Sequence, residues 1–364
     1  MKNTTFLFLF ALLYSSLAAQ LQPGFDASEY RAMLAINFNR YDSVQKAAGL
    51  PLLYRKTYTA PVTGLDNRWT LYESTDGRTA VISVRGTVAS RKSWLANIYS
   101  VMQPAQGTIR LNDSVAANYK LSADNRGAVH SGWLIALMSM SADIEGQLRA
   151  LHKRGVRAIY ITGHSQGGAI AYLLRSYLYY RTLEGALPAD IHYKTYCSAA
   201  PKPGNLVYAY DYEFINRGGW GFNIVNAADW VPETPISIQQ LQDLNPLNPL
   251  TDLRATLRRQ SFPVRIYANT VYNKLTRKSR KAAGKYHKYL GRKVGGEVRK
   301  VLPGLQLPGA VPGLDYARAG TSVVLQPDSA YFSRFPNNSA QGHGVWTHHF
   351  LDAYLFLLQK NYLQ

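Results

Sequence analysis

Ser165 lies at the centre of the stretch ITGHSQGGAIA, residues 161–171, and its surroundings fit nucleophilic chemistry. Gly163 stands two positions before it and Gly167 two positions after it. This G-x-S-x-G spacing is typical of a sharp strand-to-helix turn, where glycines leave room for the neighbouring backbone. Such a turn exposes the serine hydroxyl at a helix N-terminus, whose free N–H groups favour negative charge. The alternative is an ordinary serine between glycines at a turn.

A nucleophilic Ser165 would need two partners, because a base must take its proton and an acid must orient that base. In α/β folds with this turn, the acid follows the serine in the chain and the histidine comes last. Asp229 follows the apolar run 222–225 and precedes a proline-containing loop. We therefore expect it at the carboxyl edge of a strand, where open α/β sheets place their sites. The histidines after Ser165 are His192, His287, His343, His348 and His349.

The residues around these candidates predict strands that alternate with helices. Residues 158–162 are short and rich in strand-forming side chains, whereas residues 167–183 repeat apolar side chains at helical spacing. A second helical pattern covers 133–153, and two strands flank the turn-forming pair Asp76-Gly77. Further strand-like runs are 192–197, 222–225 and 322–325. This alternation predicts an α/β fold, with a mostly parallel sheet covered by helices on both faces.

Three other features carry structural expectations. Residues 26–47 are predicted to form one helix, with Asp26 or Ser28 as its N-cap. The polar residues 99–127 are expected to form a loop. Cys197 is the only cysteine, so no intramolecular disulfide can form, and its apolar neighbours favour a buried structural thiol.

The first residues have the pattern of a secretory signal peptide, 1–19. A lysine precedes the apolar run 6–13, and small residues follow up to Ala19. We therefore expect cleavage before Gln20 and export of the mature chain. A chain of 364 residues, 46% of them hydrophobic, can bury one large core or two modest ones, and we expect residues 20–364 to form a single domain.

The net charge of +19 is concentrated in residues 254–300, which hold fifteen Lys and Arg against one acid, Glu297. Aromatic and aliphatic residues are mixed with these cations, as in helices that bind membrane surfaces. One hypothesis is that the segment docks on an anionic lipid surface, and the other is that it forms a solvated helical face. No nucleic-acid partner is expected, because export and a nucleophilic serine do not fit one.

Five separated motifs resemble those of the class 3 lipases, which are fungal-type lipases of α/β-hydrolase fold. In chain order they are VISVRGT (81–87), VHSGW (129–133), ITGHSQGGAIA (161–171), CSAAPKPGN (197–205) and NIVNAADWVPETP (223–235). The third is close to the family's serine turn, with Gln166 where leucine is common. Five motifs in the right order are far more specific than the serine motif alone.

The resemblance implies a catalytic triad. Ser165 matches the nucleophile and Asp229 the acid. The family's base lies in a His-x-x-x-x-Tyr segment near the C-terminus, which His349 fits, with Tyr354 as the tyrosine. The neighbouring His348 and His343 remain rivals for this role.

The resemblance also implies an oxyanion hole, the set of donors that holds the negative oxygen of a tetrahedral intermediate. The backbone N–H of Gln166 matches one donor, and Thr87 matches the other through its N–H, with its hydroxyl as a further donor. By the same resemblance His130 is structural.

Two departures from the family concern the elements around the site. Residues 88–98 correspond to the family's lid, and their apolar residues are spaced to share one helical face: Val88, Trp94, Leu95 and Ile98. Ser93 and Asn97 stand where aspartates are frequent, so a moving lid and a fixed helix are both open. Asp229 and His349 are 120 residues apart, which predicts a basic helical insertion at about 236–320.

The predicted function is that of an exported serine carboxylester hydrolase, a lipase that cleaves acylglycerol or phospholipid esters and requires no cofactor or metal. Acyl preference depends on the shape of a cleft that the sequence does not give. Two alternatives remain: an esterase for polyester or feruloyl-type substrates, and a non-catalytic protein that binds anionic surfaces.

Overall fold

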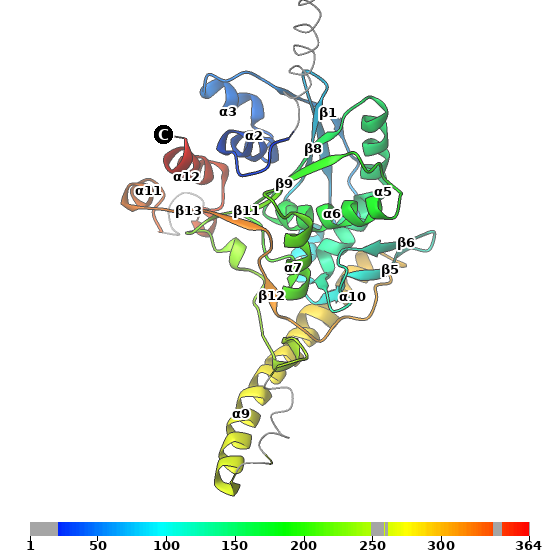
Figure 1. Cartoon of the computed structure of the whole chain (residues 1–364), viewed down its shortest axis with the longest axis vertical. Helices are drawn as coiled ribbons and strands as arrows, with labels where there is room; N and C mark the ends of the chain where they lie inside the picture. Colours follow the sequence, from blue (N-terminus) through cyan, green and yellow to red (C-terminus); the bar gives the residue numbers. More distant parts are fainter. Residues whose placement is uncertain (1–20, 249–257, 259–260, 338–343, 364) are drawn as a thin grey trace, which may run out of the picture.

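A seven-stranded sheet forms the centre of the protein. The structure is a computed structural model, and it describes residues 21–248, 258, 261–337 and 344–363 (Figure 1). The strand order is β1-β2-β3-β8-β9-β11-β13, in which β2 is antiparallel to both of its neighbours and all the other strands run parallel to β3. The strands are β1 (Tyr54–Thr59), β2 (Trp69–Ser74), β3 (Thr79–Val84), β8 (Ala158–His164), β9 (His192–Ser198), β11 (Gly221–Asn226) and β13 (Thr321–Leu325).

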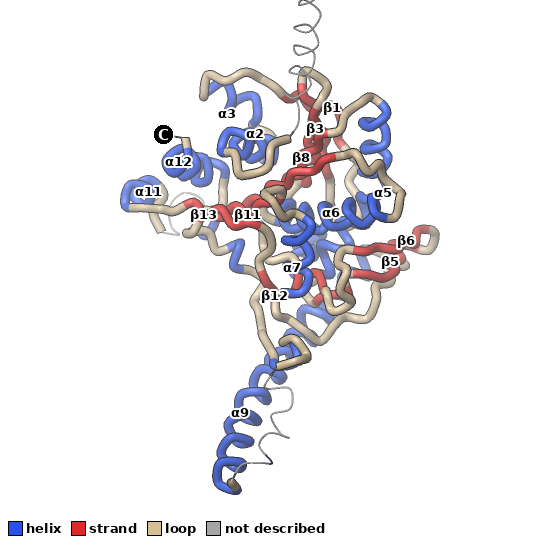
Figure 2. Tube along the Cα trace, viewed as in Figure 1, coloured by secondary structure: helices blue, strands red, loops and turns tan. Residues whose placement is uncertain are grey.

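Helices cover both faces of this sheet (Figure 2). On one face pack α5 (Ser131–Lys153) and α6 (Gln166–Leu183), and on the other pack α2 (Ala27–Asn37) and α12 (Leu351–Tyr362). Side chains of β8 alternate between the two cores, because successive residues of a strand point to opposite faces. The expected fold class is thus confirmed: a mostly parallel sheet with helices on both faces, the α/β-hydrolase arrangement.

Smaller elements complete the domain. Outside the basic segment, the described residues also form four shorter helices and three 3-10 turns. They are α3 (Tyr41–Ala47), α4 (Arg91–Ile98), α7 (Leu206–Ile215), α11 (Ser329–Arg334), η1 (Val231–Glu233), η2 (Leu241–Asp243) and η4 (Gly344–Trp346). A second sheet has the order β12 (Tyr316–Ala317), β10 (Gly204–Asn205), β7 (Ala128–His130) and β4 (Met102–Pro104). A two-stranded ribbon joins β5 (Gln106–Asn112) to β6 (Val115–Lys120).

The prediction of one helix over 26–47 was wrong, because the chain breaks into α2 and α3. Asn39 adopts a φ of 59°, a left-handed conformation that asparagine tolerates better than most residues. Of the two proposed caps, Asp26 is the one used, since its carboxylate accepts the Glu29 N–H at 2.8 Å.

The prediction of a loop over 99–127 was also wrong, because this region contains β4, β5 and β6. The ribbon of β5 and β6 fully buries only Ile109 and Tyr119, and most of its other side chains are exposed or partly exposed. Its turn is closed by the Asn112 side chain, which accepts the N–H groups of Ser114 and Val115 at 2.9 Å each. A strand pair with one buried residue in each strand leaves only a weak hydrophobic pattern, so the segment looked like a polar loop in the sequence.

The basic segment contains one long helical stretch. It consists of α9 (Phe262–Tyr286), the π-helical turn η3 (His287–Lys293) and α10 (Val294–Val301). The far end of α9 projects away from the sheet, whereas α10 lies against the body (Figure 1). Part of the segment, including Arg254 and Arg259, lies outside the described residues, as does the expected signal peptide. Within the described ranges, no helix has the length and apolar character that a membrane crossing requires.

Candidate active site

Ser165 sits in the turn between β8 and α6, at the carboxyl edge of the parallel strands. Its φ of 60° and ψ of −129° are strained for a residue other than glycine. The two glycines are needed for space, since a Cβ on Gly163 would lie 2.2 Å from the Gly167 backbone. A Cβ on Gly167 would lie 2.1 Å from the Val84 carbonyl oxygen. The sequence therefore forces the serine hydroxyl to the start of α6, where it lines a cavity.

Asp229 and His349 meet at the edge of the sheet although 120 residues separate them. Asp229 follows β11, and its Oδ2 lies 2.7 Å from the Nδ1 of His349. The same Oδ2 accepts the Tyr354 hydroxyl at 2.8 Å, and Oδ1 accepts the Val231 N–H at 3.0 Å. The Asp229 side chain is fully buried and that of His349 is 7% exposed. The carboxylate thus fixes the orientation of the ring from one side.

Of the two candidate bases that the structure describes, His349 is the one that contacts Asp229. His348 lies next to it in the chain, but its Nδ1 pairs with the Tyr331 hydroxyl at 2.8 Å and its Nε2 with Asn337 at 2.7 Å. His343 lies outside the described residues.

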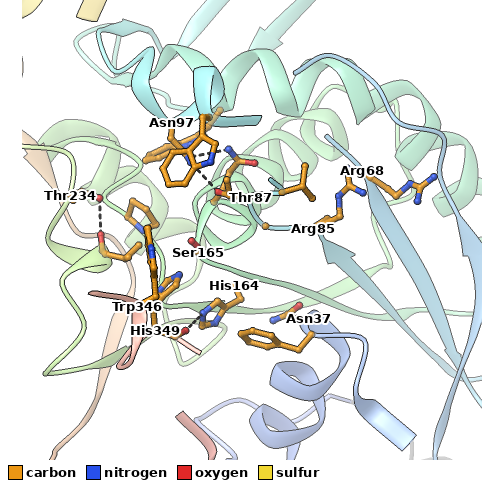
Figure 3. Close-up of a pocket in the computed structure, with 18 of the residues that line it drawn as sticks. Asn37, Arg68, Arg85, Thr87, Asn97, His164, Ser165, Thr234, Trp346 and His349 are labelled. Atoms are coloured by element: carbon orange, nitrogen blue, oxygen red, sulfur yellow. Dashed lines mark hydrogen bonds between the residues drawn. The ribbon is translucent and has the colours of Figure 1, made fainter. Parts of the chain in front are cut away.

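His349 and Ser165 line the same cavity, with His164 beside them (Figure 3). Among the described residues the Ser165 hydroxyl has no hydrogen-bond partner, which is common in an active site without substrate.

A buried hydrogen-bond chain fixes the main chain of His349. The carbonyl of His349 can only accept, so the His164 Nε2, 2.7 Å away, donates to it. Burial lowers the pKa of His164 well below its usual range, so the ring is neutral and its Nδ1 accepts from the Ser198 hydroxyl at 2.9 Å. The Tyr30 hydroxyl, 2.7 Å from Ser198, is then left to donate to it. Sequence reasoning missed this role of His164, because the position is unspecified in the serine motif.

Thr87 and Gln166 lie on the opposite side of Ser165, joined by Asn97. The Asn97 amide donates to the Thr87 hydroxyl oxygen at 2.9 Å, which leaves the hydroxyl proton free to point elsewhere. The Asn97 side-chain Oδ1 accepts the Gln166 side-chain amide at 2.8 Å and the Trp133 indole N–H at 3.3 Å. Asn97 was noted in the sequence only as a departure from the family, yet its side chain connects both candidate oxyanion residues.

The helix α4 is the expected counterpart of the family's lid. Polar contacts that could not be predicted from its sequence hold it against the rest of the protein. Gln166, whose side chain replaces the usual leucine, also donates to the Ser93 carbonyl at 3.0 Å. On the outer side Arg91 pairs with Glu297 of α10 at 2.6 Å. Of the four residues expected to share one apolar face, Val88, Trp94 and Ile98 line the cavity, whereas Leu95 is buried in the core. These contacts favour the fixed helix over the moving lid.

A cavity of about 920 Å³ opens in front of Ser165. Three tryptophans surround part of it: Trp346 lies 4.9 Å from Trp230 and 6.0 Å from Trp94 between ring centroids. The basic segment contributes to the wall through Tyr286 and Leu290. Apart from Trp94, the sequence analysis did not select these residues, although Trp230 follows Asp229 directly. The wall is suited to an apolar ligand.

His130 occupies a structural position, as the resemblance implies. Its ring stacks on Trp133 with centroids 3.6 Å apart, and its Nε2 lies 3.1 Å from the Asn97 carbonyl oxygen. Burial lowers the pKa of His130 to about 3, so the ring is neutral at physiological pH.

Cys197 is fully buried, and burial raises the pKa of its thiol well above the usual range. Both observations agree with the prediction of a buried structural thiol.

The strain at Ser165 predicts a difference between two substitutions. Ser165→Ala keeps the unfavourable positive φ, whereas Ser165→Gly removes the strain at the cost of a more flexible unfolded chain. We expect the glycine variant to be more stable than the alanine variant by about 1 kcal/mol, measured by urea unfolding. Equal stability, or a more stable alanine variant, would contradict a strained turn.

One family model resembles part of the chain. The family model of "Lipase (class 3)" matches residues 81–238, less than half of the chain. The comparison with curated proteins found no match.

Several solved lipase structures are similar to the chain. A Rhizomucor miehei lipase propeptide complex is 21% identical with a TM-score of 0.41, over 59% of this chain and 64% of that one. A lipase from Rhizopus microsporus var. chinensis is 22% identical with a TM-score of 0.39, over 58% of this chain and 68% of that one. A mono- and diacylglycerol lipase from Aspergillus oryzae is 18% identical with a TM-score of 0.41, over 59% and 76%.

The chain covers just under two thirds of the Rhizomucor miehei protein. The family model, which spans the segment that contains Ser165, Gln166 and Asp229, confirms the resemblance of residues 81–238 to the class 3 lipases.

Proposed function

We propose that the protein is a serine carboxylester hydrolase that cleaves lipid esters, with Ser165 as nucleophile, His349 as base and Asp229 as its orienting acid. The observation that carries the proposal is the buried contact of 2.7 Å between Asp229 and His349 beside a strained Ser165. The apolar cavity in front of the serine supports a lipid acyl chain as the ligand.

The proposed reaction has two halves. The Ser165 hydroxyl loses its proton to the His349 Nε2 as its oxygen attacks the ester carbonyl, while Asp229 accepts the Nδ1–H and stabilises the imidazolium. The tetrahedral intermediate collapses when His349 returns the proton to the leaving alcohol, which leaves an acyl-serine. Water then gives a proton to His349, attacks the acyl group and releases the carboxylic acid and a free Ser165.

The negative oxygen of each tetrahedral intermediate would be held by the backbone N–H of Gln166 and by Thr87. Asn97 supports this role, because its amide donates to the Thr87 hydroxyl oxygen and turns the hydroxyl proton toward another acceptor. One such donor typically contributes about 2.7–4 kcal/mol to the transition state.

Substitutions at the triad test this proposal. Ser165→Ala and His349→Ala should each lower the rate of p-nitrophenyl ester hydrolysis by roughly 10⁴-fold or more, because each removes a group that acts in the chemical step. The matched control is His348→Ala, since His348 is adjacent in the chain but contacts Tyr331 and Asn337 instead of Asp229. The assay should use a series of acyl chain lengths.

The pattern of losses separates the alternatives. A full rate in Ser165→Ala would contradict the proposal and leave the non-catalytic alternative. A loss in His348→Ala with a normal rate in His349→Ala would move the base to the neighbouring histidine. A preference for short acyl chains, with no rise in rate above the substrate's aggregation threshold, would favour a non-lipid esterase.

We also propose that α9 docks the enzyme on an anionic lipid surface. The first turns of α9 expose large apolar side chains: Phe262 is 64% exposed, Ile266 51% and Tyr267 74%. Cations follow along the same helix, which has no acidic residue. An exposed helix with apolar and cationic residues binds anionic membranes through both. The same helical stretch reaches the cavity wall at Tyr286 and Leu290, so a docked α9 would hold the cavity near the lipid.

Vesicle binding tests the docking proposal. Wild type should sediment with phosphatidylglycerol-containing vesicles in preference to vesicles of pure phosphatidylcholine. Binding to the anionic vesicles should weaken in 0.5 M salt, because the Debye length falls to about 4 Å and charges are screened beyond it. The triple variant Lys274→Gln, Lys278→Gln, Lys281→Gln should lose about 1 kcal/mol of binding per cation. A control that neutralises the exposed Lys46, Arg55 and Lys153 should lose less. No preference for anionic vesicles at low salt would contradict the proposal.

We also propose that the protein is exported, and this part of the proposal rests on the sequence of residues 1–19 alone. N-terminal sequencing of the protein outside the cytoplasm should begin at Gln20. Retention of Met1 on that protein would contradict cleavage of a signal peptide.

A further inference from the structure

The cavity in front of Ser165 has a second arm with a different chemical character. Figure 3 shows Trp346 and His349 on one side of Ser165 and Arg85 and Arg68 on the other. The arm with the arginines lies over the edge strands β1, β2 and β3. Neutral polar residues make up much of its remaining lining, beside Ile36, Phe38 and Tyr72: Asn37, Asn39, Thr59, Thr70 and Ser83. One arm is therefore apolar and aromatic, and the other is polar.

The polar arm is strongly cationic. Lys56, Arg68 and Arg85 line it, whereas no aspartate or glutamate lines the cavity anywhere in the part of the chain that the structure describes. Within the same described residues, none of the three cations forms an ion pair. The nearest acidic influence is Asp66, whose charge acts on Arg85 and partly offsets the effects of burial and of Arg68, so the arm keeps a net positive charge.

The two arginines are close to each other and incompletely hydrogen-bonded. The Arg85 N–H donates to the Arg68 carbonyl at 3.0 Å, and the Arg85 Nη2 donates to the Asp66 carbonyl at 2.7 Å. The Nε of each arginine is buried and has no partner among the described residues. Burial lowers the pKa of Arg85, and the nearby charge of Arg68 lowers it further. Two half-buried guanidinium groups that repel each other would be stabilised by a shared anion.

The strand register places these cations near the reacting bond. Val84 of β3 pairs with Gly163 of β8, so Arg85 lies across from His164, the residue before Ser165. Trp69 of β2 pairs with Val84, which puts Arg68 one strand further out. With strands about 4.8 Å apart, the Arg68 main chain is about 10 Å from the β8 main chain. The ester carbonyl and the phosphate of a glycerophospholipid are only a few bonds apart, and the long arginine side chain can cover the rest of this separation.

We propose that this arm receives the phosphate headgroup of a glycerophospholipid, so that the enzyme prefers a phosphate-bearing lipid ester to a neutral acylglycerol. Arginine suits this task, because its planar donors match two phosphate oxygens at once. The acyl chain then occupies the aromatic arm, and the scissile ester lies between the two arms at Ser165. This inference rests on the proposed function, since it names the substrate class for the same site.

Two soluble substrates with the same acyl chains test the proposal without a lipid surface: dihexanoylphosphatidic acid and dihexanoylglycerol, both below their aggregation thresholds. The readout is the ratio of kcat/KM for the two. In wild type this ratio should exceed one. Arg68→Gln should lower it by roughly 10-fold or more, because a charge-assisted hydrogen bond to the phosphate is lost. Arg85→Lys, which keeps the charge but not the planar fork, should lower it as well.

The matched control is Arg55→Gln. Arg55 is exposed on the same strand as Lys56 but does not line the cavity, so its loss removes one charge from the same region and should leave the ratio unchanged. Thermal unfolding of each variant checks that it is folded. A ratio of one or less in wild type, or a ratio that neither Arg68→Gln nor Arg85→Lys lowers, would overturn the proposal. Full activity of Ser165→Ala would instead contradict the proposed function itself.

Binding to Ser165→Ala, measured by calorimetry, separates a headgroup from free phosphate. The proposal predicts that dihexanoylphosphatidic acid binds more tightly than inorganic phosphate, and that Arg68→Gln in the same background weakens its binding. Equal binding of the two ligands would show a site for free phosphate and would overturn the headgroup assignment.

Discussion

The buried contact between Asp229 and His349 is the constraint on which the rest of the site depends. It joins the end of β11 to the turn before α12, two segments that the chain separates by 120 residues. An ionised carboxylate in the interior is costly unless donors surround it, and here the His349 ring, the Tyr354 hydroxyl and the Val231 N–H do so. The C-terminal helix must therefore dock on the sheet before the site exists. The folding of α12 and the chemistry of Ser165 are linked through one side chain.

The basic segment lies both at the cavity wall and at the protein surface. Its helical stretch has two ends with different surroundings: the exposed start of α9 is apolar and cationic, and the region around Tyr286 and Leu290 forms part of the cavity wall. Beyond the wall, α10 holds α4 through Arg91 and Glu297. Together with Asn97 and the Gln166 side chain, these contacts set α4 in place beside Thr87. Two residues that depart from the family pattern, Asn97 and Gln166, thus link α4 to the body.

Much of the fold could be predicted because its signals are local. The strand before Ser165, the helix after it and the glycines between them are dictated by spacing and by close backbone contacts. The break at Asn39 and the ribbon 106–120 were missed, since an asparagine in a left-handed turn and a strand pair with one buried stripe leave weak patterns. The choice of His349 depended on a resemblance, because five histidines follow Ser165 and spacing alone does not rank them.

Residues that act through tertiary contacts could not be found from sequence. Asn97, His164 and Arg68 come from three separate elements, and only the folded chain brings each one to the cavity. The polar arm in particular depends on strand register, since Arg85 reaches the site because β3 pairs with β8. Polar side chains of this kind look like ordinary surface residues until the sheet is assembled.

Covalent labelling with a fluorophosphonate tests the central claim most directly, since the reagent reacts with a serine only when a base and an oxyanion hole activate it. The account predicts one adduct per chain by intact mass spectrometry, located on Ser165 by peptide mapping, and slow labelling in Asp229→Asn because His349 loses the carboxylate that orients it. An unlabelled wild-type protein, or an adduct on another serine, would contradict it.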